Sequence, residues 1–266
     1  MYNDFKFKKK FGQNFLVDSN IVSKIVNTID IRNDNLVVEI GCGDGKLTKK
    51  LCEYFDYVLG YEIDLDVKER LFASLVEFDN FNIIFNDFLE CDLNKDISNY
   101  EFDNLYVVGN LPYYITTPII EKLVLSGLDF NSMTFMVQKE VGDRIGAKVG
   151  TREYGSLTVF LSYFYDIKKE FVVSRNSFVP KPNVDSMIIS FTKKSEIYDL
   201  KDRELFFKLV RDSFKFKRKT LRNNLSDGYD LEKVNSVLNK YGYDLSVRAE
   251  QLSVLIFCDI ANCLVN

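Results

Sequence analysis

Short apolar runs alternate along this chain with longer stretches whose apolar residues recur at helical spacing. Runs such as Leu36-Val37-Val38-Glu39-Ile40 are short, rich in β-branched residues and followed by glycine, which is typical of buried parallel strands. The predicted strands cover 36–40, 57–63, 82–85, 105–108 and 133–137, and the predicted helices cover 20–29, 46–54, 66–78, 117–126, 139–147 and 155–165. A later run, 187–191, predicts a final antiparallel strand. This alternation predicts an α/β fold with a Rossmann-like, doubly wound sheet.

The composition changes after residue 191. Residues 192–196 are predicted to be a linker, and the pattern of the segment beyond them predicts helices and no strand. We therefore expect a sheet domain over residues 1–192, which begins with a basic arm (1–18), and a small all-α domain over residues 193–266.

The overall composition suits a folded protein of the cytoplasm. Hydrophobic residues make up 46% of the 266 residues and charged residues 28%, which is ample for a core and argues against disorder. No apolar run reaches the ~18 residues that a membrane span needs, and the first residues contain no apolar signal core. A soluble, cytoplasmic protein without a membrane partner is expected.

Histidine is absent, and the five cysteines form no C-x-x-C pair. The absence of histidine removes the commonest general base and the commonest transition-metal ligand. The odd number of cysteines predicts reduced, mostly structural thiols, with neither a disulfide framework nor a zinc site. Any chemistry is therefore expected to run without a metal and without a Ser-His or Cys-His pair.

Two basic stretches stand out against the net charge of −4. One is the lysine cluster 6–10, and the other, 208–222, carries seven basic residues against one acid, Asp212. Drawn as a helix at about 100° per residue, residues 205–225 separate basic from apolar positions, with only Lys217 out of place. A solvated face would normally mix signs, so this one favours RNA phosphates, although the sequence leaves open whether the helix persists through 217–220. The residues predicted to contact RNA are Lys8, Lys9, Lys10, Arg211, Lys215, Arg218, Lys219 and Arg222.

The tetrad Asn110-Leu111-Pro112-Tyr113 follows the predicted strand 105–108, and ligands gather at the carboxyl ends of parallel strands. Asn110 could accept a hydrogen bond from an exocyclic amine, a carbonyl at Leu111 or Pro112 could accept a second, and Tyr113 could stack on a flat base. An ordinary strand-to-turn exit is the alternative interpretation. The four prolines lie only around this tetrad and in 180–182, which predicts two rigid loops that form the two sides of one pocket.

The glycine turn from Gly41 to Gly45 has the spacing G-x-G-x-G, which differs from the dinucleotide fingerprint and excludes a P-loop. Two acids accompany it: Glu62 near the end of the second strand suits a ribose diol, and Asp87 just past the third suits an adenine amino group. Ile63 and Phe88 beside them could sandwich that adenine. Together with the tetrad, these features fit S-adenosylmethionine.

Six segments together resemble the rRNA adenine N6-methyltransferases, most closely the small-subunit dimethyladenosine transferases of the KsgA type. They are 11–16 (FGQNFL), 39–45, 110–118 (NLPYYITTP), 138–141, 178–186 (FVPKPNVDS) and 217–225 (KRKTLRNNL). The resemblance implies an S-adenosylmethionine-dependent enzyme that dimethylates two adjacent adenosines in the 3′-terminal hairpin loop of small-subunit (16S) rRNA. It implies ribosome biogenesis as the process and the immature 30S particle as the partner, and we expect a monomer.

The resemblance also implies roles for particular residues. By motif, the cofactor contacts are Asn14, Leu16, Gly41, Glu62, Asp87 and Asn110, and we add their neighbours Gln13, Gly43, Ile63 and Phe88. The catalytic set is Asn110, Leu111, Pro112 and Tyr113, with Phe178 as a second aromatic that holds the base or, alternatively, as a core residue. Cys42 departs from the proline of many relatives, which should loosen the turn slightly.

Several alternatives remain at this point. The nearest is the sister branch that methylates large-subunit rRNA and confers macrolide resistance, although 116–120 and 219–224 favour the small-subunit type. A DNA amino-methyltransferase would more typically carry a Pro-Pro-Tyr tetrad, and the glycine spacing argues against a nicotinamide oxidoreductase. From another class, the protein could be a ribosome-assembly factor that acts mainly by binding.

Overall fold

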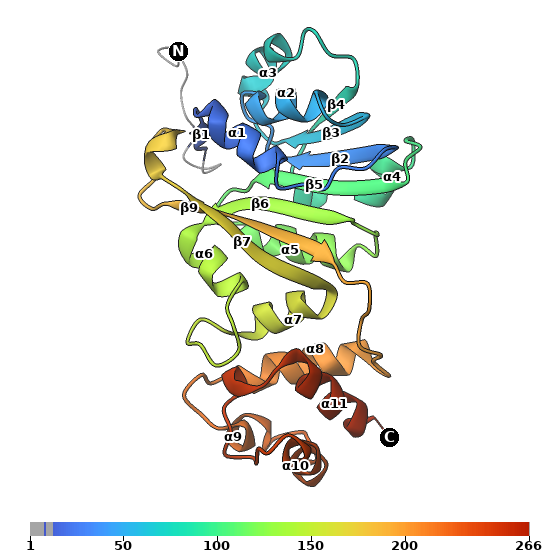
Figure 1. Ribbon diagram of the computed structural model, residues 1–266, viewed down its shortest axis with the longest axis vertical. Coiled ribbons are helices and arrows are strands. Elements are labelled where there is room, and N and C mark those ends of the chain that lie inside the picture. The colour runs from blue at the N-terminus through green and yellow to red at the C-terminus, as the bar shows by residue number, and fades with distance from the viewer. Residues whose placement is uncertain (1–7, 9–12, 266) are drawn as a thin grey trace. The chain divides into compact units, whose positions relative to one another are not determined.

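The structure, a computed structural model, describes residue 8 and residues 13–265 (Figure 1). Backbone contacts divide the chain into two compact units, Met1–Gly142 with Lys168–Lys193, and Asp143–Ile167 with Lys194–Asn266. The second unit thus includes a segment, 143–167, that the sequence prediction assigns to the sheet domain. The physical reason is packing, since Tyr154, Val159 and Tyr163 of this segment are buried among the side chains of the C-terminal helices.

The first unit contains a seven-stranded sheet with the order β4-β3-β2-β5-β6-β9-β7. Neighbouring strands from β4 to β6 are parallel, and β9 runs antiparallel to β6, as predicted. The strands are β2 (Asn35–Ile40), β3 (Tyr57–Glu62), β4 (Phe81–Phe85), β5 (Asn104–Asn110), β6 (Ser132–Gln138), β7 (Tyr165–Val173) and β9 (Ser186–Lys193). The predicted Rossmann-like α/β architecture is confirmed.

Strand β7 is absent from the sequence prediction. It lies at the edge of the sheet, and only Tyr165 and Val173 at its two ends are buried. An edge strand that buries few side chains needs no apolar run, so its sequence, YDIKKEFVV, carries little strand signal.

Helices of the first unit follow the strands in the expected alternation. They are α1 (Ser19–Val26), α2 (Lys46–Cys52), α3 (Lys68–Ser74), α4 (Leu93–Ile97), α5 (Thr116–Leu125) and α6 (Lys139–Ile145), with short 3₁₀ turns η2 (Leu65–Val67), η3 (Phe88–Glu90) and η4 (Arg175–Ser177). Buried residues of α1, α2 and α3 pack with β2, β3 and β5 in one core. The predicted helix 66–78 is shorter than expected, and α4 was not predicted. A separate two-stranded sheet pairs β1 (Phe15–Leu16) with β8 (Phe178–Val179).

The second unit is helical, with a core of its own that includes Phe206, Leu209, Leu221 and Leu225. Its elements are α7 (Ser156–Phe164), α8 (Arg203–Ser213), α9 (Leu221–Leu225), α10 (Leu231–Lys240), α11 (Val254–Leu264) and the 3₁₀ turn η5 (Ala249–Gln251). Among the described residues, no helix is long and apolar enough to cross a bilayer.

The structure settles whether one helix runs through the basic stretch. Helix α8 ends at Ser213, a turn occupies residues 214–220, and α9 begins at Leu221. The side-chain amide of Asn224 donates to the carbonyl of Ser213 at 2.7 Å, which satisfies a carbonyl left over at the helix end. The prediction that the basic residues share one face of a single helix is therefore wrong. They lie at the end of α8, in an exposed turn and at the start of α9.

Candidate cofactor and catalytic site

A cavity in the first unit lies where the parallel strands β2, β3, β4 and β5 end. The chain from Gln13 to Leu16 lines another side of it. All ten residues predicted to contact the cofactor line this cavity: Gln13, Asn14, Leu16, Gly41, Gly43, Glu62, Ile63, Asp87, Phe88 and Asn110. Parallel strand ends bring these residues together from across about 100 positions of sequence, as expected for this class of sheet.

The glycine turn requires its glycines because Gly41, Gly43 and Gly45 all have positive φ, at 83°, 56° and 83°. A Cβ atom on Gly41 would lie 3.4 Å from the carbonyl oxygen of Asn110, so the turn passes close to the tetrad. Cys42 stands where the family resemblance leads us to expect proline. Its thiol is buried and lies 3.7 Å from the carbonyl oxygen of Tyr61.

Glu62 is held rigidly at the end of β3. Its Oε2 accepts from the backbone N–H of Gly43 and its Oε1 from that of Asp64, each at 2.8 Å. The side chain is 6% exposed, and burial raises the pKa of its carboxyl group, although the backbone hydrogen bonds oppose this. A carboxylate fixed in this way is preorganised to accept hydrogen bonds from neighbouring hydroxyl groups, such as those of a ribose.

Asp87 begins the loop after β4, where its Oδ1 accepts from the backbone N–H of Leu89 at 2.9 Å. The ring of Phe88 is buried and meets Tyr61 edge to face, with centroids 5.1 Å apart. Ile63, by contrast, is 37% exposed and lines the cavity from the loop after β3. An acid flanked by two apolar side chains can take a flat ring with an amino group on its edge.

Lys122 of α5 holds this loop in place, and the sequence reasoning missed it. Its Nζ donates to three backbone carbonyls, those of Phe88 at 2.8 Å, Leu89 at 2.9 Å and Cys91 at 2.5 Å. The ammonium also lies 5.1 Å from the centroid of the Phe88 ring. No local motif signals such a contact, because Lys122 lies more than 30 positions from the carbonyls it binds.

The tetrad starts at Asn110, the last residue of β5, whose Nδ2 donates to the carbonyl oxygen of Asn14 at 3.0 Å. The Pro112 carbonyl accepts from Ile115 N–H at 3.2 Å and from Thr116 Oγ1 at 3.1 Å. These bonds occupy the Pro112 carbonyl, so of the two carbonyls considered from the sequence that of Leu111 is the candidate for the second acceptor. The hydroxyl of Tyr113 is hydrogen-bonded to Ser186 at 2.8 Å, which fixes its ring at the cavity.

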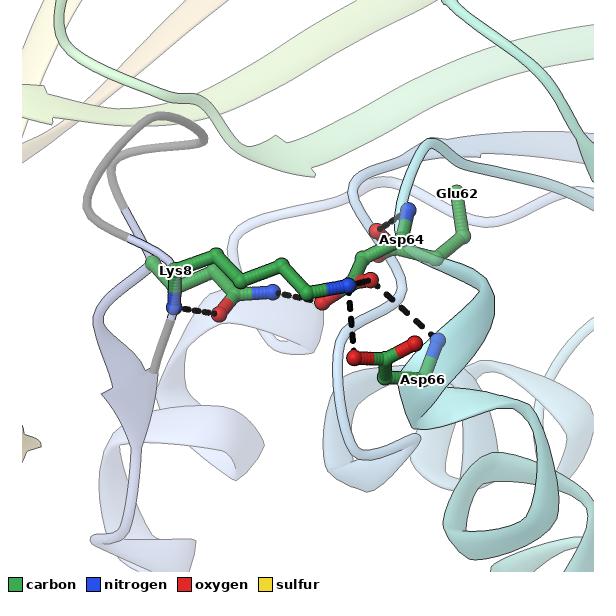
Figure 2. A network of polar contacts seen from close by, with 5 residues as sticks. Lys8, Glu62, Asp64 and Asp66 are labelled. Carbon is green, nitrogen blue, oxygen red and sulfur yellow. Dashed lines mark hydrogen bonds and ion pairs between the residues drawn. The ribbon is translucent and has the colours of Figure 1, made fainter. Parts of the chain in front are cut away.

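The segment before β1 is fastened to the loop that follows Glu62 (Figure 2). Lys8 Nζ lies 2.5 Å from Asp64 Oδ1 and 2.6 Å from Asp66 Oδ2, and Gln13 Nε2 donates to Asp64 Oδ2 at 2.6 Å. Asp64 is 1% exposed; burial alone would raise its pKa, but the hydrogen bonds from Lys8 and Gln13 outweigh it and lower the pKa. Lys8, predicted to contact RNA, is thus engaged with two carboxylates, while Lys9 and Lys10 lie outside the described residues.

Phe178, predicted to hold the target base or to be a core residue, lies in the core. The residue is 2% exposed and belongs to the core that includes Val22, Leu47 and Ile188. In β8 it pairs with Leu16, and its side chain does not line the cavity. The core interpretation considered from the sequence therefore describes Phe178 in this structure, and Tyr113 is the aromatic of the predicted catalytic set that lines the cavity.

Glu39 of β2 is a further acid at the cavity that the candidate list omitted. The side chain is fully buried, and neither carboxylate oxygen has a hydrogen bond of ordinary geometry among the described residues. Burial, with Glu62 and Asp44 nearby, raises the pKa of Glu39 to about 8, although Thr48 and Cys42 counteract part of the rise. A signal was available in the sequence, since a buried strand with an acid inside an apolar run is unusual.

These residues fit S-adenosylmethionine. The rigid carboxylate of Glu62 suits a diol, and a second acid with two apolar side chains suits an adenine; all of them line one cavity with the glycine turn. In the part of the chain that the structure describes, no group of three His, Cys, Asp or Glu side chains could hold a metal ion.

Basic residues in the second unit form an exposed surface at the end of α8, in the turn 214–220 and at the start of α9. Lys208 is paired with Asp212 and lies beside the hydroxyl of Tyr229, each at 3.2 Å. The exposed cations of this surface, which we call the basic turn, are Arg211, Lys215, Lys217, Arg218, Lys219 and Arg222. Lys217 was the one basic residue that fell among the apolar positions when the stretch was treated as a single helix. It is exposed like the others because α8 ends before it.

Over residues 4–266 the chain matches the family model described as ribosomal RNA adenine dimethylase. The chain belongs to this family. Two curated relatives, both named ribosomal RNA small subunit methyltransferase A, support the assignment. That of Streptococcus pneumoniae serotype 2 (strain D39 / NCTC 7466) is 43% identical over 268 residues, covering 98% of this chain and 92% of the relative. That of Clostridium botulinum (strain ATCC 19397 / Type A) is 41% identical over 263 residues, covering 98% and 95%.

Solved structures share the fold of this chain. A dimethyladenosine transferase from Plasmodium falciparum has a TM-score of 0.79 at 26% identity, covering 92% of this chain and 95% of that one. The 23S rRNA methyltransferase ErmE has a TM-score of 0.77 at 24% identity, covering 95% and 100%, and shows a shared fold. The family resemblance predicted from the six sequence segments is confirmed.

Proposed function

We propose that this protein transfers methyl groups from S-adenosylmethionine to N6 of adenine in small-subunit rRNA. It places two methyl groups on each of two adjacent adenosines in the 3′-terminal hairpin loop, and its substrate is the immature 30S particle. The observation that carries the proposal is the position of Asn110, at the end of β5 in the same cavity as Glu62 and Asp87. The names of the relatives at 41–43% identity support the small-subunit substrate.

The cofactor residues have distinct tasks. Glu62 accepts hydrogen bonds from the ribose hydroxyls, Asp87 accepts from the adenine amino group, and Ile63 and Phe88 hold the adenine ring. S-adenosylmethionine supplies a methyl group on a sulfonium, which is a good leaving group, so the attacking nitrogen needs no covalent help from the protein.

The tetrad prepares the target base. Adenine N6 is a poor nucleophile because its lone pair is delocalised into the ring, and the protein must localise that pair and align it with the methyl group. Because Asn110 Nδ2 is engaged with Asn14, its Oδ1 is the atom that accepts a hydrogen bond from N6, and the Leu111 carbonyl accepts a hydrogen bond from the second N6–H. Tyr113 stacks on the flipped base, a contact worth about 1–3 kcal/mol.

The two units divide the work in this proposal. The sheet unit carries the cofactor and the chemistry, and the basic turn of the helical unit contacts rRNA phosphates. We expect the protein to act as a monomer. A role as an assembly factor is compatible with this activity, because binding to the particle precedes methylation.

The deciding experiment is methyl transfer from labelled S-adenosylmethionine to unmethylated small-subunit particles, with large-subunit rRNA in parallel and nucleoside analysis of both. Dimethyladenosine in the small-subunit sample alone is the expected result. Label only in large-subunit rRNA would move the protein to the sister branch. No label in either sample, with tight particle binding, would favour the assembly-factor alternative.

A further inference from the structure

Phe216 is an exposed aromatic residue at the centre of the basic turn. Its side chain is 54% exposed, and its sequence neighbours on either side are Lys215 and Lys217. Single apolar side chains are common on protein surfaces, so the exposure alone indicates nothing. Two further features distinguish this phenylalanine: the way its backbone is held and the charge around it.

The backbone of Phe216 is held at both of its polar groups. Its N–H donates to Asn224 Oδ1 at 3.1 Å, and its carbonyl accepts from Lys219 N–H at 2.9 Å and from Asn224 Nδ2 at 3.3 Å. Asn224 belongs to α9, whose Leu221 and Leu225 are fully buried. The ring is therefore presented from a turn that is already ordered, so binding a partner costs little conformational entropy of the chain.

The sequence around Phe216 is rich in positive charge. Between Ser213 and Ser226 the chain has five basic residues and no acid. The ammonium of Lys215 lies 5.5 Å from the centroid of the Phe216 ring. An aromatic face among cations is the combination with which proteins bind unpaired nucleotides, since the ring stacks on a base while the cations meet the phosphates on either side.

We propose that Phe216 stacks on an unpaired base of the rRNA substrate, while the surrounding lysines and arginines contact the backbone on both sides of that nucleotide. The inference rests on the proposed function, because it assumes that the basic turn meets RNA. It adds a contact of a different kind from the phosphate contacts. Stacking displaces few counterions, so its contribution does not depend on salt, whereas each phosphate contact adds to the salt dependence.

The test measures binding of the full-length protein to a fluorescent transcript of the 3′-terminal hairpin with its adjoining single-stranded nucleotides. Phe216→Ala should weaken binding by about 5- to 150-fold with an unchanged slope of log K against log salt. Phe216→Trp should bind at least as tightly as the native protein. Lys217→Gln should reduce the salt slope by about one phosphate contact.

Two controls make the result specific. Tyr198→Ala removes another exposed aromatic side chain of the same unit, outside the turn, and should leave binding unchanged. A fully paired RNA duplex should bind native protein and Phe216→Ala equally, because it offers no unpaired base. Because the side chain is exposed, Phe216→Ala should melt at the native temperature, which is checked directly.

The inference is overturned if Phe216→Ala binds the transcript within twofold of the native protein, if it loses duplex binding equally, or if its salt slope falls. Loss of binding in Phe216→Trp would also overturn it. The same comparison is made on unmethylated small-subunit particles. Failure of the native protein to bind either the transcript or the particles would instead count against the proposed function, so the two failures are distinguishable.

Discussion

The side-chain amide of Asn110 donates to the main-chain carbonyl of Asn14, with 3.0 Å between the two heavy atoms. This bond joins the end of β5 to the segment before β1, so the first residue of the tetrad and the N-terminal side of the cavity are positioned together. The bond also engages the amide nitrogen, and for that reason we propose the amide oxygen as the atom that meets the substrate.

Asn110→Ala should therefore cripple methyl transfer while reducing cofactor affinity only moderately. Loss of one preorganised polar group at a reacting centre typically costs on the order of 100-fold in kcat or more. Single-turnover transfer to small-subunit particles gives the first quantity and calorimetric titration with S-adenosylhomocysteine gives the second. Asn94→Ala, an asparagine outside the cavity, serves as the control; equal losses in both quantities for Asn110→Ala would count against its catalytic role.

The contact of Lys8 with Asp64 predicts coupling between the N-terminal segment and the cofactor site. Asp64→Asn removes the charge that Lys8 faces beside the Glu62 loop, and cofactor affinity should fall by about 3- to 10-fold, as for a partly exposed ion pair. Lys8→Met should cost a similar amount. The double variant should bind no more weakly than Asp64→Asn alone, and additive losses would show that the two residues act separately.

Glu39 predicts a pH dependence of stability. The pKa of its carboxyl is about 8 in the folded protein and about 4.3 in the unfolded chain, so between these values the folded state holds one more proton. The free energy of unfolding should fall as pH rises through this window, by up to about 1.4 kcal/mol per unit, and the contribution is fully present only below about pH 4.3.

Urea unfolding at pH 5, 6, 7 and 8 measures this dependence. Glu39→Gln keeps the shape of the side chain and removes the titration, so its stability should fall less steeply with pH than that of the native protein. Parallel curves for the two proteins would contradict the prediction.

Lys122 is expected to act through the loop that carries Asp87. Lys122→Met removes three hydrogen bonds to the carbonyls of this loop and should weaken S-adenosylhomocysteine binding by about 5- to 30-fold. In a double-mutant cycle, the same change on an Asp87→Ala background should have little further effect. Lys95→Met, at an exposed lysine of α4, is the control. If the effects of the two substitutions on binding were fully additive, Lys122 would not act through Asp87 and would contribute only to general stability.

The basic turn predicts an electrostatic component of RNA binding. Reversing Arg218, Lys219 and Arg222 to glutamate should weaken binding of the rRNA transcript and flatten its salt dependence. Filter binding between about 50 and 200 mM salt measures the slope. An unchanged slope would show that these residues make no phosphate contacts and are only a solvated surface.

Much of this molecule could be predicted from local sequence. Buried parallel strands demand continuous apolar runs, the glycine turn demands positive φ at three positions, and the tetrad and acids follow the strands that carry them. The family, and the residues that line the cavity, could be predicted for the same reason, because the motifs that carry them are short and most stand at a strand end.

Tertiary structure alone decided the rest, because it depends on contacts between residues far apart in sequence. β7 forms as a half-exposed edge strand that needs no apolar run, and segment 143–167 joins the helices because its aromatic residues find a core there. In sequence Lys8 belongs to a basic cluster predicted to contact RNA and Lys122 carries no signal, yet Lys8 meets a buried carboxylate and Lys122 binds the carbonyls of a loop. Phe178 has the same residue type whether it stacks on a base or fills a core, and only packing distinguishes the two.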